Sequence, residues 1–297
     1  MERENWLAAR KNGLGGSDAA VVLGLSPWKT EFDLWAEKRG EIADSFGDTT
    51  PEHVLWGNIL EDAVAKEYAN RRGVTVRRSP EMRWSKEHPY MFANIDRKIQ
   101  GQNKLLEVKT TNSMSFSRND WGEEFTNQVP EYYLTQVMHY LAVTGYSEGD
   151  LAVLIGGQEM KIYTIKRDEH LIDIICAQEG EFWNKVITNV APVVDYNHKS
   201  AVDMLKRRYP GTNGNVVDLA GEIGLAHDKL QALNASIKEQ SDAKSALTAM
   251  IMDAVGDNTA GKLPDGSYYR RKEMPESERA FTVKARVDFR HVKNLTV

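Results

Sequence analysis

The stretch between residues 74 and 110 constrains the fold more than any other part of the chain. Four of its segments carry β-branched and aromatic residues between chain breakers, at residues 74–78, 82–84, 90–99 and 104–110. That pattern is typical of short β-strands. Gly101-Gln102-Asn103 separates the last two segments, and so short a break predicts a β-hairpin. The stretch therefore predicts a sheet whose last two strands form a hairpin.

Helices are predicted on both sides of these strands. Before them, the sequence indicates helices over residues 18–23, 30–39 and 51–72. Ser17 can cap the first helix and Thr50 the third, with Pro51 in the first turn of the third. After the strands, helices at 130–144 and 168–190 enclose a strand pair at 151–155 and 160–165. This order predicts an α/β (α+β) fold, in which a central mixed β-sheet is flanked by helices.

The chain changes character at residues 210–214, a Pro-Gly-Thr-Asn-Gly segment typical of a linker. We therefore expect a domain over residues 1–209 and a C-terminal helical plus β-hairpin extension over residues 210–297. Within the extension, Gln240 and Lys244 interrupt a heptad seam of apolar residues. A packed helix or a helical hairpin is therefore expected rather than a long coiled coil. A β-hairpin turning at residues 264–266 and a strand over 281–289 are expected to follow.

Composition excludes several classes of protein. No window approaches the about 18 consecutive apolar residues of a membrane span. The first residues lack the basic and apolar regions of a secretory signal. Cys176 is the single cysteine, which rules out an internal disulfide framework and zinc or iron–sulfur sites held by cysteines. The sequence therefore predicts a cytoplasmic protein without a membrane partner.

The net charge of −5 hides an uneven distribution. Residues 71–109 carry ten Lys and Arg against four Asp and Glu. Such a stretch is most often a solvated surface, and its meaning depends on the chemistry beside it.

That chemistry is carried by Asp96 and by Glu107-Val108-Lys109 across the predicted hairpin. Alternate side chains of a strand share a face, so Glu107 and Lys109 are expected to point one way and Val108 into the core. Asp96, on the neighbouring strand, can meet them. Two carboxylates at one spot repel unless a cation lies between them, and their hard oxygens suit Mg²⁺ or Mn²⁺. Taken alone, an acidic residue two before a lysine usually marks only an exposed strand edge.

The wider pattern resembles known nucleases. Asp96 followed by Glu107-x-Lys109 across a hairpin is similar to the PD-(D/E)xK nuclease superfamily, and Gln136-x-x-x-Tyr140 resembles the extra motif of its RecB-like members. The opening of the chain is similar to the N-terminal signature of the YqaJ/lambda-exonuclease family of phage recombinases: Arg10…Gly15-Gly16-Ser17-Asp18…Leu23-Gly24-Leu25-Ser26-Pro27-Trp28. The resemblance covers roughly residues 5 to 190.

The resemblance implies a metal centre. Asp96 and Glu107 correspond to metal-binding carboxylates, the Val108 carbonyl completes the inner shell, and Lys109 corresponds to the catalytic lysine. Glu61, in the helix before the strands, lies where the family places another acidic ligand. The implied cofactor is Mg²⁺, with Mn²⁺ as an alternative, at one or two ions per active site.

The resemblance also implies a pocket for a terminal phosphate. Arg10 and Ser17 match its arginine and serine, while Gln136 matches a polar residue near the phosphate and Tyr140 closes the motif. Two residues before Asp96, the family leads us to expect a small residue or serine, and this chain has Asn94. The Asn94 amide can still donate a hydrogen bond to a phosphate. Trp28, in a predicted loop, could stack on a base.

The implied activity is that of a metal-dependent 5′→3′ exodeoxyribonuclease that resects one strand of linear duplex DNA for single-strand-annealing recombination in the cytoplasm of a bacterial host. The family further implies a ring-shaped homo-oligomer, a trimer in its best-known relatives, and a single-strand annealing protein as partner. The extension over residues 210–297 is expected to serve oligomerisation, partner docking or DNA contact.

Two alternatives remain open from the sequence. One is an endonuclease of the same superfamily, which would cut circular DNA. The other is a non-catalytic DNA-binding recombination scaffold that kept the fold.

Overall fold

The computed structural model describes residues 9–42 and 51–274. The chain divides between Pro210 and Gly211 into two compact units, and each is described by itself. Within the described ranges, no helix is both long enough and apolar enough to cross a membrane.

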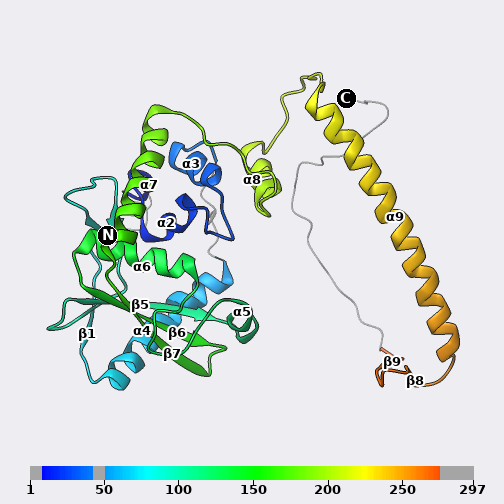
Figure 1. The fold of residues 1–297 in the computed structure, drawn as a ribbon, viewed down its shortest axis with the longest axis horizontal. Helices are drawn as coiled ribbons and strands as arrows, with labels where there is room; N and C mark the ends of the chain where they lie inside the picture. The colour runs from blue at the N-terminus through cyan, green and yellow to red at the C-terminus, as the bar shows by residue number, and fades with distance from the viewer. Residues whose placement is uncertain (1–8, 43–50, 275–297) are drawn as a thin grey trace. The chain divides into compact units, whose positions relative to one another are not determined.

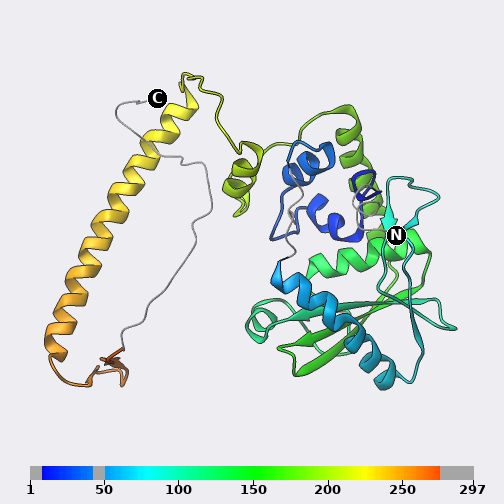
Figure 2. The same ribbon diagram turned by 180° about the vertical axis from the view of Figure 1, so that it is seen from behind.

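The centre of the first unit is a five-stranded sheet with the order β1-β4-β5-β6-β7 (Figures 1 and 2). Its strands are β1 (Val76–Arg78), β4 (Arg97–Ile99), β5 (Lys104–Thr111), β6 (Glu148–Ile155) and β7 (Glu159–Lys166). Neighbours are antiparallel except for β5 and β6, which are parallel and therefore need a crossover. The predicted mixed sheet is confirmed.

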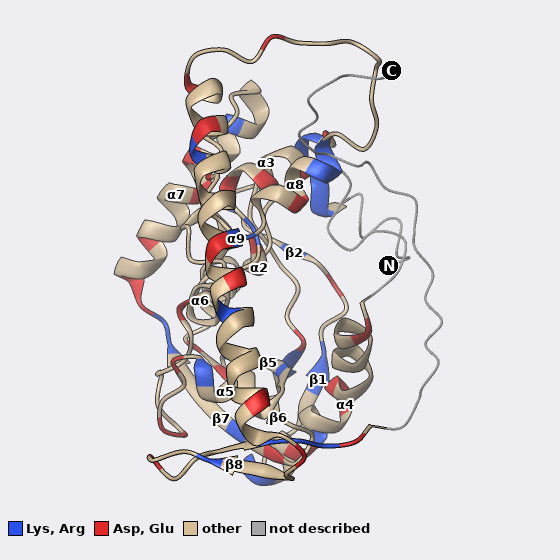
Figure 3. Cartoon of the chain, turned by 90° about the vertical axis from the view of Figure 1, so that its right-hand side faces the viewer, with Lys and Arg blue, Asp and Glu red and all other residues tan. Residues whose placement is uncertain are grey.

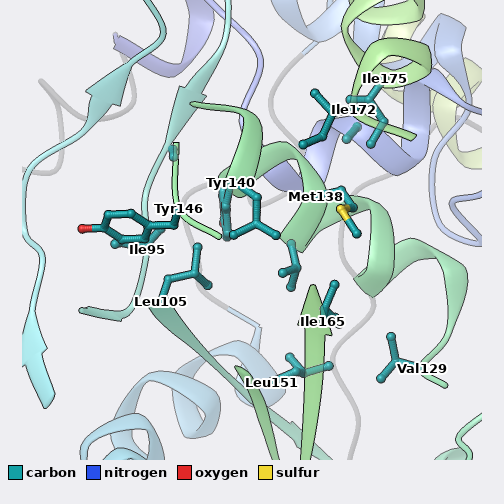
Figure 4. Close-up of a cluster of buried hydrophobic side chains, with 14 of the residues drawn as sticks. Ile95, Leu105, Val129, Met138, Tyr140, Tyr146, Leu151, Ile165, Ile172 and Ile175 are labelled. Atoms are coloured by element: carbon teal, nitrogen blue, oxygen red, sulfur yellow. The ribbon is translucent and has the colours of Figure 1, made fainter. Parts of the chain in front are cut away.

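Helices cover both faces of this sheet. On one face, α4 (Glu52–Arg72) packs its Val64 and Tyr68 against Leu106 and Val108 of β5. On the other face lies α6 (Glu131–Thr144), where Met138 is buried in one cluster with Leu105, Leu151 and Ile165 (Figure 4). Successive residues of β5 thus point to opposite faces, as the period of a strand requires.

A second helical layer packs on α6. Helices α2 (Gly16–Val22) and α7 (Glu169–Thr188) contact α6, and α3 (Glu31–Arg39) contacts both of them. Two short helices were not predicted: α5 (Ser113–Arg118) and α8 (Ala201–Arg208). The layered arrangement leaves α2 beside the α6 face of the sheet, where the candidate site lies.

Several predicted helix ends are confirmed because they depend on local capping. Thr30 accepts from the backbone N–H of Asp33 (3.1 Å), and Asp33 accepts from that of Thr30 (2.8 Å), which closes a reciprocal cap on α3. Gly40 and Gly73 end their helices with φ of 73° and 64°, in the left-handed region that favours glycine. Pro51 precedes the first turn of α4 instead of lying in it, and Thr50 falls outside the described residues.

The predicted cap of α2 was wrong. Gly15, not Ser17, precedes the helix, and Ser17 lies exposed in its first turn. The Gly15 N–H donates to Asp18 Oδ2 at 3.1 Å, so the side chain that bonds back to the start of the helix is that of Asp18. The Ser17 hydroxyl lies on the surface.

The single strand predicted over residues 90–99 is two strands. β3 (Phe92–Ala93) pairs with β2 (Arg83–Trp84) in a separate two-stranded sheet, while β4 joins the main sheet. Asp96 lies in the bend just before β4 rather than on a strand. Its Oδ2 accepts from the Val108 N–H at 2.7 Å, so a side chain takes the hydrogen bond that a strand partner would otherwise make.

Over residues 211–274, the second unit holds one long helix and a small hairpin. α9 (Glu222–Val255) is continuous over 34 residues, so of the two expected forms, a single helix or a helical hairpin, the hairpin was wrong. β8 (Ala260–Lys262) and β9 (Tyr268–Arg270) form the predicted β-hairpin. The strand predicted over residues 281–289 lies outside the described residues.

Candidate active site

The candidate site forms where β5 passes the bend before β4. Glu107 and Lys109 point to the α6 face of the sheet, while Val108 packs with α4 on the other face. The hydrogen bond from the Val108 N–H to Asp96 Oδ2 holds the Asp96 carboxylate beside them. Three residues that are separate in sequence thus meet at one point.

Glu107 is the most enclosed member of the group, with only 3% of its surface exposed. Its Oε1 accepts from Lys109 Nζ and from Gln136 Nε2, both at 2.7 Å. Its Oε2 is buried and accepts from no N–H or hydroxyl group among the described residues, while the Asp96 carboxyl lies within hydrogen-bonding reach of Glu107. A buried carboxylate oxygen without a partner is costly, and a bound cation would satisfy it.

The electrostatics of the group favour a cation. Burial raises the pKa of Asp96 well above its usual range, and the Glu107 carboxylate adds to the rise. Burial likewise raises the pKa of Glu107. For Lys109, burial alone would lower the pKa, but Glu107 and Asp96 raise it overall, so its side chain is an ammonium ion. The raised pKa values reflect the cost of burying two like charges together, and a bound cation would offset that cost.

Glu61 lies close enough to act on this group, since its charge raises the pKa of both Asp96 and Glu107. However, Arg97 holds its carboxylate: Nη1 of Arg97 donates to Glu61 Oε1 and to the Asp96 carbonyl, and Nη2 donates to Asp62. In the part of the chain that the structure describes, no three Asp, Glu, His or Cys side chains gather tightly enough to hold a metal.

The residues nevertheless fit a divalent cation, because the buried Oε2 of Glu107 is available as a ligand. Asp96 and Glu107 offer hard oxygen ligands, and Glu61 could join them by exchanging its Arg97 partner for the ion. The role expected of the Val108 carbonyl stays a prediction.

A cavity of about 190 Å³ opens beside the carboxylates. It is lined by Arg10, Gly15, Gly16, Ser17, Phe92, Asn94 and Tyr140. Arg10 Nη2 donates to Ser17 Oγ at 3.5 Å. The sequence-predicted residues Arg10, Ser17, Asn94 and Tyr140 thus surround one cavity.

Close packing under the cavity requires glycine at two positions. A Cβ on Gly16 would lie 2.5 Å from a carbon of the Tyr140 ring, and one on Gly15 would lie 2.8 Å from the Phe92 ring. Real Cβ atoms do not approach so closely, so the glycines let α2 lie against α6 and β3.

Two residues that were expected near the substrate, Gln136 and Trp28, do not line the cavity. Gln136 does not line it; its Nε2 bridges Glu107 Oε1 and, at 3.0 Å, Tyr140 Oη. Trp28 is 58% exposed outside the cavity and packs edge-on against Tyr132, with ring centroids 4.9 Å apart.

Sequence reasoning missed three supporting residues. Lys38 Nζ donates to Asp18 Oδ2 and to the Arg10 carbonyl, both at 2.8 Å, and so fixes the base of the cavity. Tyr133 places its ring 5.5 Å from Lys109 Nζ. Arg97 had a signal, since it directly follows Asp96, whereas nothing in the sequence links Lys38 to Asp18.

This arrangement of a mixed sheet, flanking helices and a carboxylate–lysine group on β5 is the fold of PD-(D/E)xK nucleases. The alkaline exonuclease LHK-Exo from Laribacter hongkongensis shares the fold at a TM-score of 0.50 and 18% identity, over 63% of this chain and 93% of that chain. LHK-Exo in complex with dAMP gives the same TM-score at 19% identity, over 69% of this chain and 97% of that chain.

The family follows from sequence. The model of the YqaJ-like viral recombinase domain matches residues 5–147. The protein YqaJ of Bacillus subtilis (strain 168) is 42% identical over 223 residues, which span 74% of this chain and 67% of that protein. The chain belongs to the YqaJ-like viral recombinase family.

Proposed function

We propose that the chain is a divalent-metal-dependent exodeoxyribonuclease that digests one strand of linear duplex DNA in the 5′→3′ direction for single-strand-annealing recombination. The buried, unpartnered Oε2 of Glu107, beside Asp96 and the Lys109 ammonium, is the observation that carries the proposal. The cavity around Arg10 supports the preference for an end.

Asp96 and Glu107 would hold Mg²⁺ or Mn²⁺, joined by Glu61 and the Val108 carbonyl, and one or two bound ions would supply Lewis-acid stabilisation and an activated water. Lys109, as an ammonium ion, donates to the phosphate oxygen on which negative charge develops. Gln136 keeps Glu107 oriented through its 2.7 Å hydrogen bond.

Arg10 and Ser17 bind the 5′-terminal phosphate in this proposal, with the Asn94 amide as a further donor. Tyr140 connects the two regions, because it lines the cavity and accepts from the same Gln136 amide that holds Glu107. A phosphate in the cavity would therefore lie one residue away from the carboxylate group. Trp28 is free of the cavity and exposed, as a base-stacking residue would be.

The assembly and setting are part of the same proposal. We place the nuclease in residues 1–209 and assign oligomerisation, partner docking or DNA contact to residues 210–297. The family resemblance supports a ring-shaped homo-oligomer, a trimer, that passes the resected strand to a single-strand annealing protein in the bacterial cytoplasm.

Digestion of three DNA substrates with Mg²⁺ tests the proposal. We expect rapid loss of the 5′-phosphorylated strand of a linear duplex, slower loss from a 5′-hydroxyl end, and intact closed circles. Arg10→Gln should remove the difference between the two ends and leave circles intact. Cutting of circles would instead identify an endonuclease, and binding without any cutting would identify a scaffold.

A further inference from the structure

Helix α9 exposes large apolar side chains along its whole length. Ile223, Leu230, Leu233, Ile237 and Leu247 are each between 54% and 63% exposed, and none of the 34 residues of the helix, all of them described, is buried. Figure 3 shows that uncharged residues make up most of α9. Such a helix, about 50 Å long, is normally stabilised by packing its apolar face against a partner.

The apolar residues keep one heptad register on both sides of the two polar residues Gln240 and Lys244. From Ile223 to Ile251, every seventh residue is apolar except Lys244, and the residues three positions further on are apolar except Gln240. Gln240 and Lys244 therefore take up two positions of the seam, and the heptad register is the same before and after them. A seven-residue repeat held over the whole helix is the pattern of a coiled coil.

We infer that α9 pairs with α9 of a second copy of the chain in an antiparallel coiled coil centred at residue 242. In an antiparallel pair, the first position of a heptad on one helix faces the fourth position of a heptad on the other helix. The numbers of two facing residues then add to twice the number of the central residue. With the centre at 242, Ile237 faces the partner's Leu247 and Leu233 faces the partner's Ile251. Gln240 faces the partner's Lys244, so every seam residue from 230 to 254 meets one of its own kind.

Charge selects this orientation. A parallel, in-register pair would put Lys244 opposite the partner's Lys244, and two buried ammonium groups would repel. In the antiparallel pair, the Gln240 side-chain carbonyl can accept from the partner's Lys244. Ser241 and Ala243, which flank the seam at the centre, are small and uncharged, so the helices can approach there without opposing charges.

The inference is independent of the nuclease proposal, because it uses only residues of the second unit. If the nuclease units do not assemble among themselves, the pairing of α9 makes a dimer, and its disruption halves the molar mass. If they do assemble, the pairing of α9 joins two or more assemblies, and its disruption lowers the molar mass to that of one assembly.

Sedimentation of the full-length protein tests the pairing. Ile237→Glu, in the seam, is expected to lower the mass to half or less at micromolar concentration. Ala235→Glu adds the same charge two residues away, outside the seam, and is expected to leave the mass unchanged. Both positions are exposed in the single chain, so neither substitution should unfold it. An equal mass for the wild type and Ile237→Glu would overturn the inference.

Cysteine crosslinking tests the orientation. The double variant Leu233→Cys, Ile251→Cys should form a disulfide-linked dimer on oxidation, whereas each single variant should stay monomeric on a denaturing gel. Positions 233 and 251 lie about 27 Å apart along one helix, too far for a disulfide within it. Cys176 is buried and should not react. Crosslinking of Leu233→Cys alone would indicate a parallel pair and overturn the inference.

Discussion

At the scale of single residues, the site depends on partners that hold the charged groups in place. Arg97 is buried and contacts the carboxylates of Glu61 and Asp62 as well as the Asp96 carbonyl. The sequence located Asp96, Glu107 and Lys109 because the strand period and the hairpin are local features. It could not locate the Arg97–Glu61 or Lys38–Asp18 pairs, because these form only when separate helices and strands pack together.

We therefore expect Arg97→Gln to destabilise the fold by about 2 kcal/mol, since Glu61 and the Asp96 carbonyl lose a buried donor. Arg78→Gln removes an exposed partner of the same Asp62 and should change the stability much less. Urea unfolding of the two variants measures the difference. An equal change in both would show that Arg97 is no more important than a surface arginine.

At the scale of elements, one buried pair joins α6 to α7 and β3. His139 Nδ1 contacts Glu179 Oε1, and Nε2 contacts the Phe92 carbonyl, each at 2.8 Å. Both partners accept, so both ring nitrogens donate and the imidazole is charged. Burial alone would lower the pKa of His139, but the Glu179 carboxylate raises it by more. The pKa of His139 is therefore raised above 6.5 overall. Since Phe92 and Tyr140 line the cavity, this pair fixes two of its walls.

The sign of the pH dependence follows. The folded protein binds the His139 proton more tightly than the unfolded chain does, so the stabilisation is complete below about pH 6.5 and is lost as the pH rises through the folded-state pKa. The free energy of unfolding lost in His139→Gln should therefore be larger at pH 6 than at pH 9. His170→Gln, at an exposed position, serves as the control. A loss that is constant with pH would contradict a charged His139.

Elements also show where sequence reasoning succeeds and fails. The ends of α3 and α4 were predicted because Thr30, Gly40 and Gly73 act within their own turns. The strand over residues 90–99 was mispredicted because the chain bends between β3 and β4, where the Asp96 side chain accepts from the Val108 N–H across the hairpin. A contact of that kind leaves no mark in a local pattern.

At the scale of the whole molecule, several Lys and Arg of the basic stretch over residues 71–109 are already paired with carboxylates. Lys104 is buried against Asp150, Lys109 against Glu107, and Arg72 pairs with Asp150. Arg77 and Lys98 are exposed and lie directly opposite each other on β1 and β4. Like charges at such a position repel each other, and a DNA phosphate would relieve the repulsion.

We expect Arg77→Gln with Lys98→Gln to weaken DNA binding and to reduce the slope of log affinity against log salt by about two. Lys199→Gln with Lys206→Gln removes the same charge from other exposed positions and should leave the slope unchanged. Fluorescence anisotropy with labelled duplex DNA over a range of salt concentrations measures both. Equal slopes in the two double variants would show that DNA does not contact Arg77 and Lys98.

The most direct test of the carboxylate site is the rate at which Glu107→Gln digests a linear 5′-phosphorylated duplex in Mg²⁺, with DNA binding measured alongside. The substitution keeps the size of the side chain but removes the charge and the unpartnered carboxylate oxygen that would hold the ion. We expect the rate to fall by at least about 100-fold while the protein stays folded and DNA affinity changes little. A rate within a few-fold of the wild type would contradict metal-dependent catalysis at Glu107.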